Sequence, residues 1–133
     1  MKHILLDTHT WVWSLTAEAR LSAAATDAME QAETVSISAI SLFEVGQKVR
    51  LGKWPEMEPF LSRLIGLAAE QGGRLVEVSA ETSLLAATLE WGHRDPFDRF
   101  IAATAITRGL TLISTDSAFD TLTTNPSWPG RFW

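Results

Sequence analysis

Four carboxylates occupy positions where an α/β protein could bring them together: Asp7, Glu44, Asp98 and Asp116. Asp7 and Asp116 each follow a short apolar run that is typical of a buried strand. Glu44 and Asp98 lie near the starts of expected helices. Ligands of an open parallel sheet gather outside the carboxyl ends of its strands. We therefore expect the four acids to meet at that edge of one sheet.

Acids gathered in this way need charge compensation. Two unit charges about 4 Å apart repel by roughly 4 kcal/mol at an effective dielectric near 20. Several such pairs would exceed the contribution of one helix cap, which is about 1 kcal/mol. The cluster thus implies bound protons or a divalent cation. Near neutral pH the simpler expectation is a hard cation that prefers oxygen ligands, Mg²⁺ or alternatively Mn²⁺.

Each of the four acids also has a structural explanation when it is taken alone. For Asp98 it is the favourable interaction of an acid with the dipole in the first turn of a helix. Asp7 could end a strand or cap the helix that follows it, and Asp116 could cap the short helix after it. Glu44 fits a capping box that begins at Ser41. Lys48, four residues further on, could form an ion pair with Glu44. The joint pattern of the acids, rather than any one of them, therefore favours a site.

Asp98 favours a functional role on its own. Asp95 and Pro96 form a helix-start signature, which makes Asp95 the expected N-cap and Asp98 the third helical residue. Asp98 shares a helix face with Ile101 and Ala102, which are apolar and would pack on the sheet. A carboxylate at the head of such a face is partly desolvated, which a helix cap rarely requires. We interpret Asp98 as functional and Asp95 as mainly structural.

The elements that must position these acids alternate along the chain. Hydrophobic periodicity and breaker residues predict strands at 2–6, 35–38, 75–78 and 110–113, helices at 10–15, 22–33, 40–51, 59–71, 80–91, 96–108 and 117–122, and a short edge strand within 128–133. Strands separated by helices indicate right-handed crossovers. The fold class expected is α/β, a three-layer α/β/α sandwich with a central parallel sheet.

Length and composition narrow the class of protein further. The 133 residues predict a single domain spanning 1–133, and 46% hydrophobic with 20% charged residues is typical of a globular protein. No apolar run approaches the roughly 20 residues of a membrane span, and no signal peptide is evident. The absence of cysteine excludes disulfides, thiolate zinc sites and cysteine nucleophiles. A cytoplasmic location is the expectation.

The net charge of −5 argues against non-specific nucleic-acid binding by the whole surface. A local basic patch is still open, because Lys48, Arg50 and Lys53 fall within six positions without an intervening acid. The alternative is a solvated helix face, which is the commoner origin of such a group.

The motifs resemble those of PIN-domain ribonucleases and, within them, VapC-type toxins of bacterial toxin–antitoxin pairs. The resemblance runs from residue 1 to about residue 125. It is carried by the segments 5–9, 38–44 with Lys48, 95–99 with 102–105, and 112–116 with Phe119. The acidic quartet of the family falls on the four acids above. The polar position two before its last acid, commonly threonine, is Ser114 here.

The resemblance implies a PIN-like sandwich and Mg²⁺- or Mn²⁺-dependent cleavage of single-stranded regions of RNA. It also implies a small antitoxin protein that occupies the acidic groove, and a homodimer. The leading hypothesis is metal-dependent phosphodiester hydrolysis by an endoribonuclease. Its main metal ligands would be Asp7 and Asp98, with Glu44 and Asp116 binding directly or through water.

Several neighbours of the acids are expected to support the site or bind substrate, namely Thr8, His9, Ser114 and Arg99. Arg99 could draw RNA past the acids. Trp11 or Trp13 could stack on bases, although a packed helix face is the stronger expectation for tryptophans at this spacing. The main alternative function is a non-catalytic PIN-like module whose acidic groove binds a basic peptide. Retention of all four acids favours the enzyme.

Overall fold

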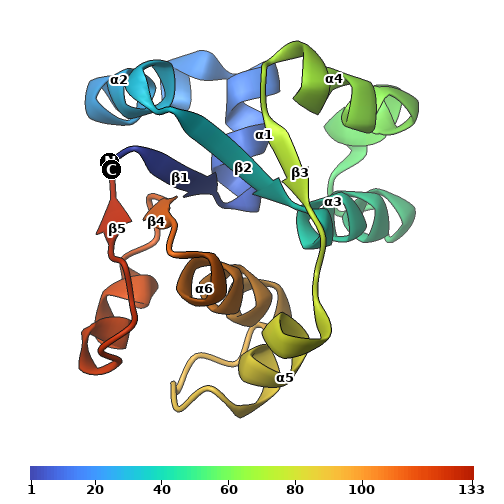
Figure 1. Cartoon of the computed structure of the whole chain (residues 1–133). Coiled ribbons are helices and arrows are strands. Elements are labelled where there is room, and N and C mark those ends of the chain that lie inside the picture. Colours follow the sequence, from blue (N-terminus) through green and yellow to red (C-terminus); the bar gives the residue numbers. More distant parts are fainter.

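The computed structural model describes residues 1–133 and contains a five-stranded sheet in the order β3-β2-β1-β4-β5 (Figure 1). All neighbouring strands are parallel. The strands are β1 (His3–Leu6), β2 (Thr34–Ser38), β3 (Arg74–Val76), β4 (Thr111–Ile113) and β5 (Arg131–Phe132). The predicted parallel sheet is confirmed, and the C-terminal tail supplies the expected edge strand.

Helices cover both faces of the sheet, which confirms the predicted three-layer sandwich (Figure 1). The helices are α1 (Thr8–Thr16), α2 (Ala23–Gln31), α3 (Ala39–Arg50), α4 (Leu64–Glu70), α5 (Ala80–Thr88) and α6 (Pro96–Arg108), with the short 3₁₀ helices η1 (Glu18–Arg20), η2 (Pro55–Arg63) and η3 (Ser117–Thr124). Helices α1 to α4 and η2 contribute to one apolar cluster, and α6 and η3 contribute to the other, against which α5 also packs.

The central strand β1 shows why both layers are needed. Ile4 and Leu6 pack into the cluster that contains Trp11, whereas Leu5 packs into the cluster that contains Ile101. Successive side chains of a strand point to opposite faces of the sheet, so a strand covered on both sides is apolar throughout. The continuous apolar run before Asp7 is therefore the central strand, and it delivers Asp7 to the carboxyl edge of the sheet.

Two predicted helices differ from the observed ones. The helix expected at 80–91 ends at Thr88, because the carbonyls that follow it are bound by a side chain from α6, as described below. The helix expected at 59–71 is an α-helix only from Leu64, and the preceding turns form η2 with Pro59 inside it. Proline has no N–H for an α-helical hydrogen bond, and η2 has the tighter 3₁₀ geometry.

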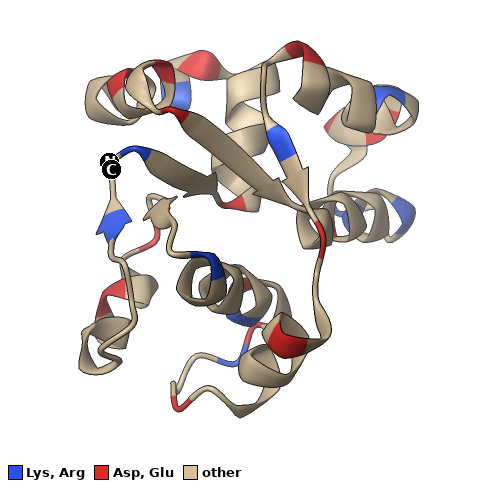
Figure 2. Ribbon diagram, in the orientation of Figure 1, with Lys and Arg blue, Asp and Glu red and all other residues tan.

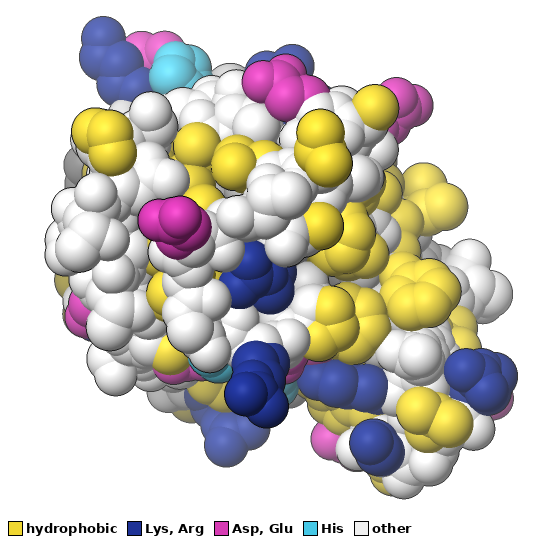
Figure 3. All heavy atoms as spheres, turned by 90° about the horizontal axis from the view of Figure 1, so that it is seen from below, with side chains coloured by type: hydrophobic (Ala, Val, Ile, Leu, Met, Phe, Trp, Pro, Cys, Tyr) yellow, Lys and Arg dark blue, Asp and Glu magenta, His cyan; other side chains and the backbone are white.

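The surface carries scattered charges of both signs (Figure 2). Seen from below, apolar side chains gather into a patch among the charged ones (Figure 3). The largest exposed apolar side chains of the chain include Phe43, Ile65 and Leu84, each more than half exposed. Each helix of this structure is too short or too polar to span a membrane.

Candidate active site

Asp7 is fixed in place by both of its carboxylate oxygens. It is the N-cap of α1, and its Oδ1 accepts a hydrogen bond of 2.8 Å from the backbone N–H of Thr10. Its Oδ2 accepts a hydrogen bond of 2.5 Å from the hydroxyl of Ser114. Only 7% of Asp7 is exposed. Strand β1 and helix α1 therefore hold the Asp7 carboxylate at a defined position.

Ser114 connects the ends of β1 and β4. It is fully buried, and its hydroxyl oxygen also accepts a 3.0 Å hydrogen bond from the backbone N–H of Asp116. Asp116 is exposed and caps η3 by accepting from the backbone N–H of Ala118 at 2.9 Å. Arg131 of β5 donates to the Ser114 carbonyl at 3.0 Å, so the tail strand also supports this corner. The Ser114 hydroxyl therefore contacts both the Asp7 carboxylate and the backbone of Asp116.

Asp98 lies in the first turn of α6, whose N-cap is Asp95 as expected. The Asp98 carboxylate contacts Nε2 of His93 at 2.6 Å. Burial raises the pKa of Asp98 from its usual 3.8 to about 6; the nearby charges of Asp95 and Asp116 add to the increase, and the His93 hydrogen bond opposes it. The surroundings of Asp98 thus disfavour its ionised form.

Glu44 reaches the site by a different local structure from the one expected. The predicted capping box is wrong, because α3 begins at Ala39 and Ser38 is its N-cap. Ser41 lies inside the helix and its hydroxyl hydrogen-bonds to that of Thr8 at 2.8 Å. Glu44 is buried and forms the expected ion pair with Lys48, at 2.5 Å. The pair leaves Glu44 facing the other acids while partly neutralising its charge.

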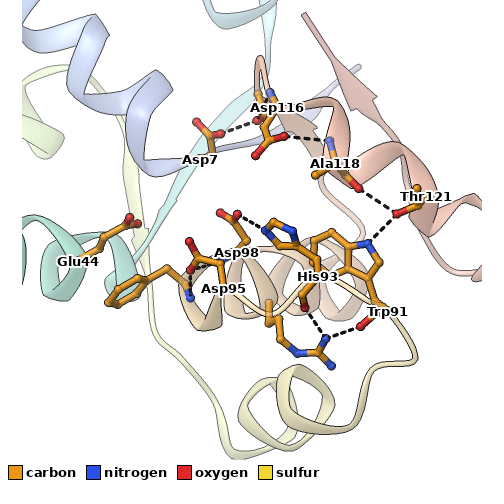
Figure 4. A network of polar contacts seen from close by, with 12 residues as sticks. Asp7, Glu44, Trp91, His93, Asp95, Asp98, Asp116, Ala118 and Thr121 are labelled. Carbon is orange, nitrogen blue, oxygen red and sulfur yellow. Dashed lines mark hydrogen bonds and ion pairs between the residues drawn. The ribbon is translucent and has the colours of Figure 1, made fainter.

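The four acids line one cleft of about 400 Å³, together with Asp95. Figure 4 shows Asp7, Asp98 and Asp116 pointing toward a common space, with Glu44 approaching it from α3. Ligand atoms of His93, Asp98 and Asp116 lie within 4.8 Å of one another, close enough to share a single cation. Two of the four acids thus lie within this distance of a shared ligand position, and Asp7 and Glu44 line the same cleft.

His93 is the site residue that sequence reasoning missed as a candidate ligand. It lies in the segment between α5 and α6, where no periodic pattern places a side chain. Its ring packs against that of Trp91 in a tilted arrangement, with the ring centroids 4.7 Å apart, and the Trp91 Nε1–H donates to Thr121. The available signal was its position five residues before Asp98, just ahead of a helix start.

The contacts of Arg99 differ from those expected of a substrate-binding residue. Its guanidinium donates to the backbone carbonyls of Ala86, Leu89, Trp91 and His93. Four of the five N–H groups of the side chain are used in this way. Arg99 therefore organises the loop that carries His93, and few of its donors are left for a phosphate.

The remaining predicted neighbours lie beside the acids. Thr8 is buried and bonded to Ser41, whereas His9 is exposed at the rim of the cleft. Trp11 is fully buried in the core, so it cannot stack on a nucleic-acid base. Trp13 is partly exposed and lines the cleft.

Comparisons with known proteins place this arrangement in a family. The family model for the PIN domain matches residues 4–124. This chain belongs to the PIN-domain family. Ribonuclease VapC22 from Mycobacterium tuberculosis is 35% identical to this PIN-domain protein over 117 residues, which cover 87% of this chain and 88% of the relative. The predicted resemblance to VapC-type PIN-domain ribonucleases is thereby confirmed.

Solved structures share the fold of this PIN domain. VapBC-5 from Mycobacterium tuberculosis, a member of the VapBC family of toxin–antitoxin systems, matches with a TM-score of 0.65, 21% identity and full coverage of both chains. VapBC2 from Rickettsia felis, bound to a DNA fragment from its promoter, matches with a TM-score of 0.67, 19% identity and 96% coverage of each chain. FitAcB from Neisseria gonorrhoeae matches with a TM-score of 0.65, 22% identity and coverage of 98% and 96%.

Proposed function

We propose that this PIN-domain protein is a metal-dependent endoribonuclease that hydrolyses RNA phosphodiester bonds and acts as the toxin of a type II toxin–antitoxin pair. The observation that carries the proposal is the convergence of Asp7, Glu44, Asp98 and Asp116 in one cleft. The relationship to ribonuclease VapC22 supports RNA as the substrate.

The donor set suits a hard divalent cation. Carboxylate oxygens dominate the cleft, and Mg²⁺ and Mn²⁺ favour such ligands. Asp98, Asp116 and His93 would hold the cation, because their ligand atoms lie within 4.8 Å of one another. Asp7 and Glu44, which line the same cleft, would be further oxygen donors, either direct or through water. A nearby cation would also favour the ionised form of Asp98, whose burial otherwise disfavours it. When bound, the cation supplies Lewis acidity toward the phosphate and toward the attacking water.

The residues of the chain orient the reacting groups. Ser114 and the Thr10 N–H fix the two oxygens of Asp7, so that carboxylate does not have to be reoriented when substrate binds. Lys48 lies in the cleft and brings a positive charge toward an incoming phosphate. In the reaction an oxygen of water bonds to phosphorus and the ester bond breaks. One RNA fragment then ends in a phosphate and the other in a hydroxyl.

The proposed biological setting is cytoplasmic, where a toxin of this type would meet RNA and a cognate small antitoxin. A basic segment of the antitoxin would complement the acidic cleft electrostatically. A homodimer would need exposed apolar surface, and the side chains of Phe43, Ile65 and Leu84 are each more than half exposed. Light scattering on the purified protein would measure the oligomeric state, and co-expression with the antitoxin should relieve the growth arrest caused by the toxin.

The enzymatic proposal is tested with the purified chain and a single-stranded RNA in Mg²⁺ or Mn²⁺. Wild-type protein should cleave, and Asp7→Asn and Asp98→Asn should not, while circular dichroism shows a retained fold. Asp27→Asn is the matched control, because Asp27 is exposed on α2, outside the cleft. Undiminished cleavage by both site variants would rule out the metal assignment. An inactive wild type that still binds a basic peptide would instead favour the non-catalytic module.

A further inference from the structure

A second cavity opens next to the acidic cleft and has the opposite chemistry. It measures about 330 Å³, and its lining combines three rings with three cations: His9, Trp13, Trp54, Arg20, Lys48 and Lys53. Glu56 is the one acid among its lining residues. His9, Trp13 and Lys48 also line the acidic cleft, so the two spaces adjoin. A substrate bound at the acids could therefore extend directly into this second cavity.

The rings of the cavity form a continuous row. The centroid of His9 lies 5.1 Å from that of Trp54 and 6.0 Å from that of Trp13, and Trp13 lies 6.0 Å from Trp133. Trp54 is 9% exposed and forms the base of the row, whereas His9 is exposed and Trp13 partly so. Mutual packing restricts the side chains, so His9 and Trp13 present aromatic surface that is already ordered. Such a surface stacks on nucleobases with little regard to their sequence.

The cations are arranged around this row. Cζ of Arg20 lies 4.9 Å from the Trp13 ring centroid, and Nζ of Lys48 lies 5.4 Å from the Trp54 ring centroid. Lys53 is exposed and, like Arg20, takes part in none of the ion pairs of the chain. The cavity thus gathers positive charge on a chain whose net charge is −5. This local excess favours an anionic ligand.

We propose that this cavity binds an unpaired nucleotide of the RNA, next to the phosphate held at the acids. The base stacks on His9 and Trp13, and the phosphate of the nucleotide contacts Lys53 and Lys48. The inference rests on the proposed RNA cleavage and deepens it, because it makes an unpaired nucleotide part of substrate recognition. A basic antitoxin segment fits the cavity less well, since Arg20, Lys48 and Lys53 would repel it.

Lys48 has a particular position in this arrangement. It lies in both spaces, paired with Glu44 on one side and above the Trp54 ring on the other. A phosphate at the junction of the two spaces would lie close to Lys48. Lys48 therefore marks the boundary between the site of bond cleavage and the site of base recognition.

The test measures the fluorescence anisotropy of a fluorescein-labelled 12-nucleotide single-stranded RNA, with Ca²⁺ replacing Mg²⁺ and RNA integrity checked on a gel. Trp13→Leu should weaken single-strand binding about tenfold, and Trp13→Phe should stay within about threefold of wild type, since stacking needs a ring. Lys53→Ala should weaken binding severalfold. It should also reduce the steepness of the plot of log binding constant against log salt concentration by about 0.7, the value for one phosphate contact on a single strand. Duplex RNA should show no response to the loss of the ring.

Lys2→Ala is the charge-matched control, because Lys2 precedes β1 at the opposite edge of the sheet from the acids. It should bind as wild type does. Thermal melting by circular dichroism checks the fold of Trp13→Leu. If Trp13→Leu is unstable, Lys53→Ala still tests the site, because Lys53 is exposed and its truncation should leave the fold intact.

The outcomes separate this inference from the proposed function. Wild-type single-strand affinity in both Trp13→Leu and Lys53→Ala, equal losses for duplex RNA, or a wild type that binds no RNA would overturn the nucleotide site. Variants that keep RNA affinity but no longer retain a co-expressed antitoxin would assign the cavity to protein. A wild type that binds in the expected pattern but cleaves nothing in Mg²⁺ or Mn²⁺ would refute the nuclease and leave the site standing.

Discussion

The two sides of the acidic cleft are built differently. On the side of β1 and β4, Asp7 is buried, and both of its oxygens accept hydrogen bonds from fixed donors. On the side of α6, the Asp98 side chain is 24% exposed and has the His93 ring as its main partner. The Asp7 carboxylate is thus held in place by fixed hydrogen-bond donors. The negative charge of Asp98 has fewer compensating partners.

This difference indicates that Asp7 and Asp98 have different roles in the proposed site. A carboxylate whose two oxygens are each held by an internal hydrogen bond has little to gain in orientation from a ligand. A carboxylate whose pKa is raised to about 6 by burial gains from any cation that comes near it. In the proposed metal site, Asp7 would therefore offer an oxygen whose position is already fixed, and Asp98 would gain the most from a bound cation.

The largest expected effect is the loss of activity in Asp98→Asn. RNA cleavage should fall by more than about 100-fold, because even partners in the outer shell of a metal site cost 10–100-fold when removed. Initial rates on a labelled single strand in Mn²⁺ measure this. Asp7→Asn should lose a similar amount of activity but also lower the melting temperature, since its amide cannot accept from Ser114 and the N–H of Thr10 with both atoms. Equal stability of the two variants would contradict the proposed difference between the sides.

The next largest expected effect is a loss of stability when the side chain that binds the His93 loop is removed. Arg99→Met removes the donors to four backbone carbonyls and should destabilise the protein by about 3 kcal/mol, because the carbonyls, two of them on buried residues, lose charge-assisted hydrogen bonds. Chemical denaturation measures the free energy of unfolding. Arg108→Met is the matched control and should change it by less than about 0.5 kcal/mol, because Arg108 is exposed at the end of the same helix. Comparable losses in both variants would remove the structural role assigned to Arg99.

Ser114 tests the scaffolded side of the cleft. Ser114→Ala deletes the hydroxyl shared by Asp7 and the Asp116 N–H, and activity should fall 10–100-fold while the fold is kept. Ser114→Thr retains the hydroxyl and should restore most of the activity. Calorimetric titration with Mn²⁺ should show weakened binding for Ser114→Ala. Unchanged binding and activity would mean that the hydroxyl does not position Asp7.

The sequence predicted the parts of this arrangement that depend on local signals. The apolar run before Asp7 identified β1, and the Asp95-Pro96 start identified α6 with Asp98 in its first turn. The order of the acids along a βα alternation was enough to predict that they meet at one edge of the sheet. These features follow from periodicity and capping, which act over a few residues.

The remaining features depend on contacts between distant segments. The role of Arg99 requires the end of α5 and the following loop to fold over its guanidinium, and no spacing in the sequence encodes that. Ser41 matched a capping pattern, but α3 starts three residues earlier because Ser38 at the end of β2 already caps it. The cavity lined by His9, Trp13 and Trp54 joins α1 to the segment after α3, which only tertiary packing brings together.

The smallest expected effect concerns the pH dependence of stability in the metal-free protein. The pKa of Asp98 is about 6 in the folded state and its usual value is 3.8, so the folded state binds more protons between these values. Stability therefore falls as pH rises through this window, and the loss of folding free energy persists above pH 6.

Asp98→Asn carries no such charge and should be more stable than wild type at pH 7.5 by about 1 kcal/mol, allowing for partial exposure of the side chain. The advantage should be largely lost near pH 3, where the carboxyl is mostly protonated in both states. Urea denaturation with EDTA at the two pH values measures the difference, and added Mn²⁺ should reverse its sign at pH 7.5 because the cation stabilises wild type selectively. A wild type that is the more stable protein at pH 7.5 without metal would show that the Asp98 side of the cleft is as well satisfied as the Asp7 side.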